Sequence, residues 1–313
     1  MGMNYVGIDV SGQSLDLAMA GSGVVRLANS AAGVERLVER LAGLEQPHVV
    51  CEATGRHTRL LARQLGARGI AFSRVNPRRV RELARASGQL AKTDAIDAGV
   101  ILRFAETMQP QPDPPPQPQA IELAELVRRR RQLVDMLVAE KQRDGEPEAE
   151  LVRASVKAHV AFLSAAVKHL DAAIATAIAA DAEFNRRAGL LCSIPGIGNT
   201  TAAVLVAELP ELGRIDKKAI AALAGVAPFV RNSGQFRGQA HIGGGRISVR
   251  CALYMATISA IRANPPIKTF YTHLRQAGKP AKLAIVAAMR KLLITANAIL
   301  ATGRPWTPTP NHP

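Results

Sequence analysis

The chain has 313 residues, three cysteines and a formal net charge of +15 at neutral pH. This length allows two or three domains with buried cores, and cysteines that lie far apart, with no C-x-x-C pair, argue against a disulfide framework and a zinc site. The start lacks the pattern of a secretory signal, and the most apolar late segment carries Arg290 and Lys291 at its middle, so we expect a cytoplasmic protein without a membrane span.

Residues 1–107 show strand and helix patterns in turn. Five stretches have the apolar pattern of strands, at 4–10, 14–20, 23–29, 47–53 and 70–75. Apolar residues at helical spacing lie between and after them, and Asn76 followed by Pro77 marks a helix start. The order strand, strand, strand, helix, strand, helix, strand, helix, helix predicts a mixed α/β sheet layer.

Four acidic residues of this domain could form a metal site. Asp9 ends the first predicted strand, Glu52 follows the fourth, and Asp94 and Asp97 share one face of a predicted helix. A ribonuclease-H-like sheet gathers a metal site in this way. Two carboxylates 4 Å apart repel each other by about 4 kcal/mol at an effective dielectric of about 20, so such a cluster needs cations.

Magnesium is the default cation for this cluster. Two such ions can hold both the attacking and the leaving oxygen of a phosphodiester. Each acid alone also has an ordinary interpretation, as a residue that closes a turn or as a charge at a helix start.

Residues 108–118 contain so many prolines that they predict an extended, stiff linker. Residues 119–183 then predict a helical hairpin, which either packs within its own domain or forms a dimerising coiled coil. Four consecutive arginines, Arg128–Arg131, are either a solvated face or a nucleic-acid contact.

Residues 184–313 predict a mainly α-helical domain with a strong positive charge. They hold 17 Lys or Arg against 3 Asp or Glu, and no acid occurs from Lys217 onward. Solubility alone explains such a bias poorly, so it favours nucleic-acid binding.

Residues 193–198 predict the turn of a helix-hairpin-helix element. Gly196 and Gly198 would let backbone N–H groups approach a phosphate, and the next helix start adds partial positive charge. The alternative is a tight structural turn with no ligand.

Residues 230–246 suit a loop wrapped on a scissile phosphate, because Arg231, Arg237 and Arg246 lie among glycines. Ser233 is the candidate nucleophile of this loop, but a serine needs a base, a metal or a cation-rich site to become reactive. His241 is the neutral base nearby in the sequence. A plain turn role for Ser233 is the alternative.

Several motifs together resemble the DEDD insertion-sequence transposases. The matching segments are Gly7–Asp9, Cys51–Gly55, Lys92–Ala98, Ile194–Gly198, Gly225–Pro228, Ser233–Gly234, Gly244–Arg246 and Ala252–Met255. They occur in the family's order over most of the chain. The departures are small, since Gly12 stands where a lysine is common and His57 where an aromatic residue is common.

The resemblance implies a RuvC-like fold for the amino-terminal domain and a bacterial recombinase guided by a structured bridge RNA, which pairs with donor and target DNA. It implies that Ser233 becomes joined to a DNA 5′ phosphate while Asp9, Glu52, Asp94 and Asp97 hold Mg²⁺. It also implies a homotetramer, a dimer of dimers, in which acids and serine can come from different protomers.

Two other functions remain open at this point. One is a metal-dependent nuclease or junction resolvase in which water attacks and Ser233 only positions the phosphate. The other is an RNA- or DNA-binding module without catalysis.

Overall fold

The computed structural model describes residues 3–308, apart from residues 54, 89–93, 116, 144, 146–148, 230–231, 234–235 and 238–240. For residues 56, 94–96, 232, 233, 236 and 237 it describes the backbone only. The chain forms two compact units, Met1–Gln117 and Pro118–Pro313. The division falls inside the proline-rich segment.

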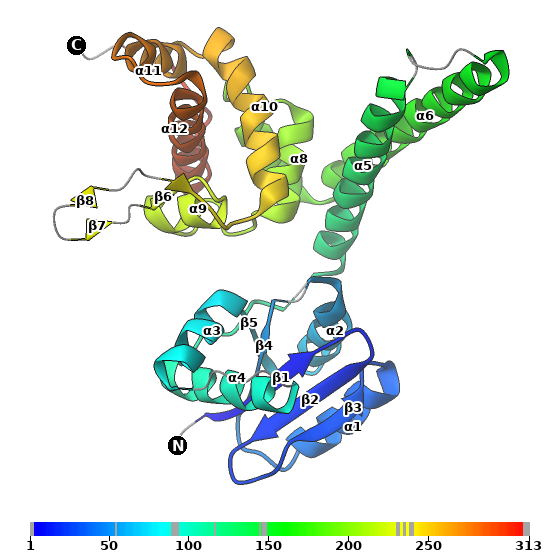
Figure 1. Ribbon diagram of the computed structural model, residues 1–313, viewed down its shortest axis with the longest axis vertical. Coiled ribbons are helices and arrows are strands. Elements are labelled where there is room, and N and C mark those ends of the chain that lie inside the picture. Colours follow the sequence, from blue (N-terminus) through cyan, green and yellow to red (C-terminus); the bar gives the residue numbers. More distant parts are fainter. Residues whose placement is uncertain are drawn as a thin grey trace. The chain divides into compact units, whose positions relative to one another are not determined.

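A five-stranded mixed sheet forms the centre of the first unit (Figure 1). Its strands are β1 (Asn4–Val10), β2 (Ser14–Met19), β3 (Val25–Ala28), β4 (Pro47–Glu52) and β5 (Ala71–Val75), in the spatial order β3-β2-β1-β4-β5. The first three strands pair antiparallel, whereas β1, β4 and β5 run parallel. All five lie where the apolar patterns predict strands.

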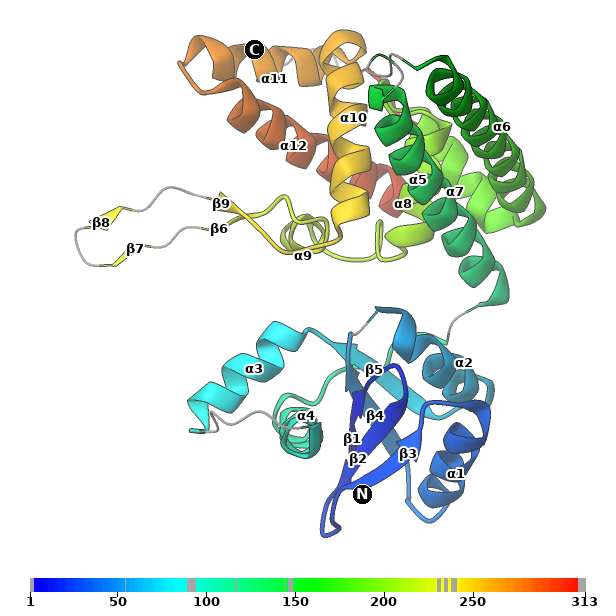
Figure 2. The same cartoon turned by 45° about the vertical axis from the view of Figure 1, so that its right-hand side comes forward.

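Helices cover both faces of this sheet (Figure 2). The helices α1 (Ala31–Leu41) and α2 (Arg59–Ala67), the latter preceded by the short 3-10 helix η1 (Gly55–Thr58), pack on one face, where they share a core with Ile8 and Cys51. The helices α3 (Pro77–Ala86) and α4 (Asp94–Met108) pack on the other face, where their core includes Val50 and Val75. Residues that alternate along one strand therefore belong to different cores.

The segment predicted as a linker binds the edge strand β5 before it leaves this unit. The Asp113 amide donates to the Phe72 carbonyl over 2.7 Å, and the Ser73 hydroxyl donates to the Gln111 carbonyl over 2.8 Å. The Asp113 carboxylate also pairs with Arg74 at 2.7 Å. Hydrogen-bonding groups of the edge strand β5 are thus paired by the chain itself.

The second unit begins with the predicted pair of long helices, α5 (Pro118–Arg143) and α6 (Glu150–Ala180), which pack against each other. Arg130 of α5 pairs with Asp171 of α6 at 2.5 Å. Leu123 of α5 and Ile174 of α6 belong to the same buried cluster as the helices that follow. The pair therefore shares a core with the rest of its unit.

The remaining helices are α7 (Ala182–Cys192), α8 (Asn199–Glu208), α9 (Lys217–Leu223), α10 (Ile247–Ala263), α11 (Pro265–Gln276) and α12 (Ala281–Thr302). Two helices of the described chain, α6 and α12, are long and apolar enough to cross a membrane by length and composition. In α12 the apolar side chains pack inside the second unit, since Leu292, Leu293 and Ala296 are fully buried in its core.

Between α9 and α10 of the described chain lie four strands of two residues each, β6–β9, which we call the arm and which project from the helices of this unit (Figures 1 and 2). At its root β6 (Pro228–Phe229) pairs with β9 (His241–Ile242), and further out β7 (Asn232–Ser233) pairs with β8 (Phe236–Arg237), both antiparallel. The sequence predicted a loop here. The structure shows two short ladders instead.

Candidate functional site

Asp9 and Glu52 lie side by side at the carboxyl-terminal ends of the neighbouring central strands β1 and β4, which we call the acidic edge of the sheet. These strands are parallel with Ile8 opposite Cys51, so the next residue of each strand is one of the two acids. Ile8 and Cys51 face the α1/α2 core, and the two acids therefore face the α3/α4 side. Two of the four predicted carboxylates thus occupy adjacent positions on one face.

Helix α4 packs closely on this same face because Gly7 has no side chain. A Cβ atom at Gly7 would lie 2.6 Å from the Ala98 carbonyl oxygen, and it would also meet the Leu102 backbone nitrogen. Tyr5, two residues before Gly7, packs against the cluster that contains Phe104. From Gly7, β1 continues to Asp9, whereas from Ala98 a short step back along α4 reaches its amino end. Asp9 and the amino end of α4 therefore lie on the same side of this contact.

That amino end of α4 carries the other two predicted acids. Asp97 is half-buried in its first turn, and Asp94 is its first residue, although the Asp94 side chain lies outside the described part of the chain. The packing on Gly7 therefore brings the start of α4 toward the sheet edge that holds Asp9 and Glu52.

The charge at this edge acts on a neighbouring thiol. Burial raises the pKa of Cys51 far above its ordinary value, the Arg74 guanidinium lowers it, and the charges of Asp113, Glu52 and Asp9 raise it further. Both Asp9 and Glu52 are thus close enough to influence one buried group. Asp9 and Glu52 are thus neighbours in the strand register, and the charges of both act on the same thiol.

A fifth acid, Asp16, lies on the same face and was missed by the sequence analysis. It sits directly opposite Asp9 in the β1–β2 ladder, is 3% exposed, and binds Arg26 through two hydrogen bonds of 2.7 and 3.1 Å. The signal that could have found it is a charged residue at the centre of the apolar stretch SLDLAM. Because Arg26 neutralises it, Asp16 adds less negative potential than an unpaired acid would.

The donor set at this edge fits a hard divalent cation. Carboxylate oxygens are the ligands that Mg²⁺ prefers, and two adjacent carboxylates repel each other unless a cation lies between them. Among the described side chains, no group of three His, Cys, Asp or Glu could hold a metal ion. Asp9 and Glu52 are the pair that the strand register brings together.

Ser233 lies in the other unit, on β7 in the outer ladder of the arm, opposite Phe236. Arg237 follows on β8, opposite Asn232. The side chains of Ser233 and Arg237 and the whole of Arg231 lie outside the described part of the chain. His241, the base suggested by the sequence, is exposed on β9 at the root.

The root of the arm is fixed by backbone packed on backbone. Gly225 has a φ of 70° and Gly245 a φ of 68°, and a Cβ on Gly245 would overlap the Gly225 backbone. The Arg246 amide donates to the Leu223 carbonyl over 2.8 Å, which ties the end of the glycine run to α9. We call this contact the glycine lock.

Arg246 makes a structural ion pair next to this lock. Its guanidinium holds both oxygens of Glu211 at 2.6 Å and donates to the Glu208 carbonyl over 3.0 Å. The sequence predicted a phosphate contact for Arg246. In the structure its charge is engaged by one of the three acids of residues 184–313.

The two glycines of the predicted phosphate-binding turn differ in their surroundings. Gly196, with a φ of 102°, packs so closely on Ala260 of α10 that a Cβ would lie 2.5 Å from the Ala260 Cβ. Gly198 precedes α8 as its N-cap, has open space around it, and makes no side-chain cap hydrogen bond. Gly196 therefore has a packing role, and Gly198 is the one that a ligand could approach.

The two departures from the expected family pattern are neighbours in the structure. A Cβ on Gly12, in the turn between β1 and β2, would lie 3.2 Å from the His57 Cε1 atom in η1. His57 thus occupies the space that a side chain at position 12 would need.

Sequence comparisons with known proteins match most of the chain. Residues 6–144 match a DEDD family described as transposase, and residues 188–272 match the transposase IS116/IS110/IS902 family. The chain is 31% identical over 263 residues to the pilin gene-inverting proteins of Moraxella bovis and Moraxella lacunata, which covers 83% of this chain and 81% of each relative. An IS110 insertion-element protein of Streptomyces coelicolor is 29% identical over 116 residues, 36% of this chain and 29% of that protein.

Proposed function

The chain belongs to the IS110 family of transposases, and from this premise we propose that it is a bridge-RNA-guided DNA recombinase that cuts and rejoins donor and target DNA through a serine. The observation that carries the proposal is the adjacent pair Asp9 and Glu52 in a chain whose carboxyl-terminal third is acid-poor and basic. The names of the Moraxella relatives describe the inversion of a gene, which is a recombination of DNA.

The amino-terminal unit would supply the metal site. DEDD transposase domains use a divalent metal, and we assign Mg²⁺ to Asp9, Glu52, Asp94 and Asp97. When bound there, the ion would offset negative charge on the phosphate oxygens as the phosphodiester is attacked. Within the chain, Asp9 and Glu52 present adjacent carboxylates, and α4 brings the other two acids toward them.

The arm would supply the nucleophile. The Ser233 Oγ attacks the phosphorus, forms a phosphoserine ester with the DNA 5′ phosphate, and releases a 3′ hydroxyl, while the serine proton passes to that leaving oxygen or to solvent. A 3′ hydroxyl from the other DNA then attacks the ester, which rejoins the strands and frees the serine. No Asp or Glu occurs after Asp216, so acidic assistance to Ser233 must come from elsewhere in the sequence or from a second protomer.

The basic unit would hold the phosphates around this step. Gly198 offers a backbone approach at the start of α8, and Arg231 and Arg237 flank Ser233 in the sequence. Arg246, which is ion-paired with Glu211, would instead hold the root of the arm in place. Gly196 would act through the shape of the turn, because it is packed against α10.

The bridge RNA would carry sequence specificity by base pairing, which leaves the protein to bind backbone and shape. We propose a homotetramer, a dimer of dimers, as the assembled form. The +14 charge of residues 184–313 supports binding to nucleic acid in general.

A metal-dependent nuclease or junction resolvase that activates water is the second candidate. The observation in its favour is that Asp9 and Glu52 are assembled within the first unit, whereas Ser233 belongs to the second. In that case the serine would only position the phosphate.

Covalent trapping separates these two functions. The protein, combined with RNA transcribed from the DNA flanking its gene, is given nicked duplexes that carry the matching sequences. We expect a protein–DNA adduct with the wild type, none with Ser233→Ala, and none with Asp9→Asn. Both variants should still bind DNA, because neither removes a positive charge.

Two matched controls complete the trap. Ser259→Ala removes an exposed hydroxyl on α10 that bonds only its own helix, and Asp135→Asn changes an exposed acid on α5, so both should form the adduct. Cleavage by Ser233→Ala at the wild-type rate would remove the serine from the chemistry and favour the water mechanism. Full activity of Asp9→Asn would contradict the metal site.

A further inference from the structure

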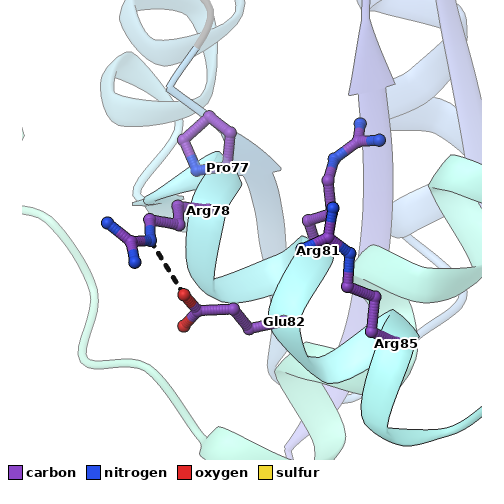
Figure 3. Close-up of a pocket in the computed structure, with 5 residues that line it drawn as sticks. All are labelled: Pro77, Arg78, Arg81, Glu82 and Arg85. Atoms are coloured by element: carbon purple, nitrogen blue, oxygen red, sulfur yellow. Dashed lines mark hydrogen bonds and ion pairs between the residues drawn. The ribbon is translucent and has the colours of Figure 1, made fainter.

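Helix α3 presents an arginine face to solvent. Arg78, Arg81 and Arg85, together with Pro77 and Glu82, line a concavity of about 300 Å³ along one side of this helix (Figure 3). The opposite side of α3 is in the core, where Val80 is buried. We call Arg78, Arg81 and Arg85 the α3 arginine face.

Only part of this charge is compensated. Arg78 pairs with Glu82 at 2.8 Å, one turn along the helix. Figure 3 shows Arg81 and Arg85 without such a bond, and no acid among the described residues pairs with either of them. Arg81 and Arg85 are therefore two cations without an acidic partner in the part of the chain that the structure describes.

The placement of these cations is unfavourable for the isolated protein. Like charges four residues apart on a helix, as in Arg81 and Arg85, repel each other and destabilise the helix. The first turn of α3 contains no acid, although a helix start favours negative charge, and it holds Arg78 and Arg79. A bound anion would relieve both penalties.

Helix α3 begins next to the strand ends that carry Asp9 and Glu52. It begins directly after β5, and Val75, the last residue of β5, is the register partner of Glu52. The Asn76 side chain caps it by accepting from the Arg78 amide, and Arg79 lies over the Phe104 ring of α4 at 5.4 Å. Pro77 is thus two residues from the partner of a proposed metal ligand.

We propose that the α3 arginine face binds the phosphodiester backbone of the nucleic acid at positions flanking the phosphate that Asp9 and Glu52 act on. The inference rests on the proposed function for the identity of the neighbouring site. Its ligand is a run of phosphates, which arginine contacts with its paired N–H donors. Duplex DNA and RNA share this chemistry.

Binding measured without divalent metal tests this inference independently of catalysis. The full chain is titrated at several salt concentrations against a labelled duplex DNA of arbitrary sequence and against a labelled RNA hairpin. Arg81→Gln with Arg85→Gln should lower affinity at least about tenfold near 0.1 M salt. The slope of log affinity against log salt should fall by about 1.8, or about 0.9 for each phosphate of duplex DNA that the variant no longer neutralises.

The matched control is Arg36→Gln with Arg40→Gln. These exposed arginines have the same four-residue spacing on α1, which packs on the opposite face of the sheet. The control should change neither affinity nor slope by more than a small fraction of the effect at α3. Thermal unfolding completes the comparison, because removal of the like-charge pair should leave the α3 variant at least as stable as the wild type.

The outcomes are distinct. A loss of affinity with DNA only, with RNA only or with both supports the α3 arginine face and identifies the strand it holds. Equal losses in the α3 variant and the α1 control would mean that only net charge matters and would overturn the proposal. A failed serine trap with a specific loss at α3 would reject the proposed chemistry while keeping this surface.

Discussion

His48 is fully buried on β4 and joins the proline-rich segment to the sheet. Its Nε2 atom lies 2.8 Å from the Ser73 hydroxyl, which donates to the Gln111 carbonyl, so the imidazole must donate to Ser73 through Nε2–H. The Nδ1 atom is buried and has no hydrogen-bond partner among the described residues. This arrangement suits a neutral ring, because a proton on Nδ1 would be left unpaired.

Burial lowers the pKa of His48, and the Asp113 carboxylate opposes this effect only in part. The folded protein therefore resists protonation that the unfolded chain accepts near its ordinary pKa of about 6.5. The stability that the neutral His48 ring contributes is fully present above that pH. It is lost as the pH falls from there toward the pKa of His48 in the folded protein. The loss can reach about 1.4 kcal/mol for each pH unit.

Urea unfolding of the wild type and of His48→Gln at pH 8 and pH 5.5 measures this loss. A glutamine keeps a donor for Ser73 and does not titrate. On acidification the wild type should lose more free energy of unfolding than the variant. A constant difference between the two proteins would show that His48 does not control the pH dependence.

Single residues also show where the sequence was informative. Asp9 and Glu52 were found because strand-end acids are visible in the pattern, and the register then places them together. The ion pair of Arg246 with Glu211 could not be foreseen, because it joins residues 35 positions apart in the chain. Asp16 was missed because a charged residue in a strand normally faces solvent, and here Arg26 permits its burial.

At the scale of elements, the contact of α4 with β1 sets the position of two predicted metal ligands. Every other residue type at position 7 would bring a Cβ within overlap distance of the α4 backbone at Ala98 and Leu102. The helix would have to move away from the sheet, and Asp97 would move with it.

Gly7→Ala should therefore lower the free energy of unfolding by about 1–3 kcal/mol, as overpacking does, and should reduce the yield of covalent adduct. The matched variant is Gly99→Ala in the same helix, where an added Cβ meets nothing within 4 Å. That change should raise stability by up to about 1 kcal/mol and leave the adduct unchanged. Normal adduct formation by Gly7→Ala would separate the helix position from catalysis.

The elements themselves were predictable where periodicity is strong. The five strands of the sheet and the long helices α5 and α6 follow their apolar patterns, and Asn76 with Pro77 marks the start of α3 as predicted. The arm was not predictable, because strands of two residues contain no period and the surrounding glycines are typical of loops. The glycine lock could not be predicted from a local sequence pattern, because it depends on a contact between Gly225 and Gly245, which are distant in the sequence.

At the scale of the whole molecule, the proposed chemistry is divided between two units with separate cores. The acids belong to Met1–Gln117 and the serine to Pro118–Pro313. In a tetramer, a reaction site could combine the acids of one protomer with the serine of another. The family resemblance suggested this possibility, and the separate cores of the two units are compatible with it.

Mixing two inactive variants tests the combination. Ser233→Ala keeps the acids, and Asp9→Asn keeps the serine, so a site shared between protomers would be restored in mixed assemblies. We expect the mixture to form a covalent adduct, and only on the Asp9→Asn chain, which a size tag on one partner makes distinguishable. No adduct in a mixture shown to contain mixed assemblies would place acids and serine in the same protomer.

The glycine lock at the root of the arm also limits which side chains these two positions can carry. Gly225 and Gly245 touch through their main chains, so a methyl group on Gly245 would push against Gly225, and one on Gly225 would push against the Gly244 carbonyl. A side chain at either position would therefore force the backbone at the root of the arm to move, although neither residue carries a reactive group.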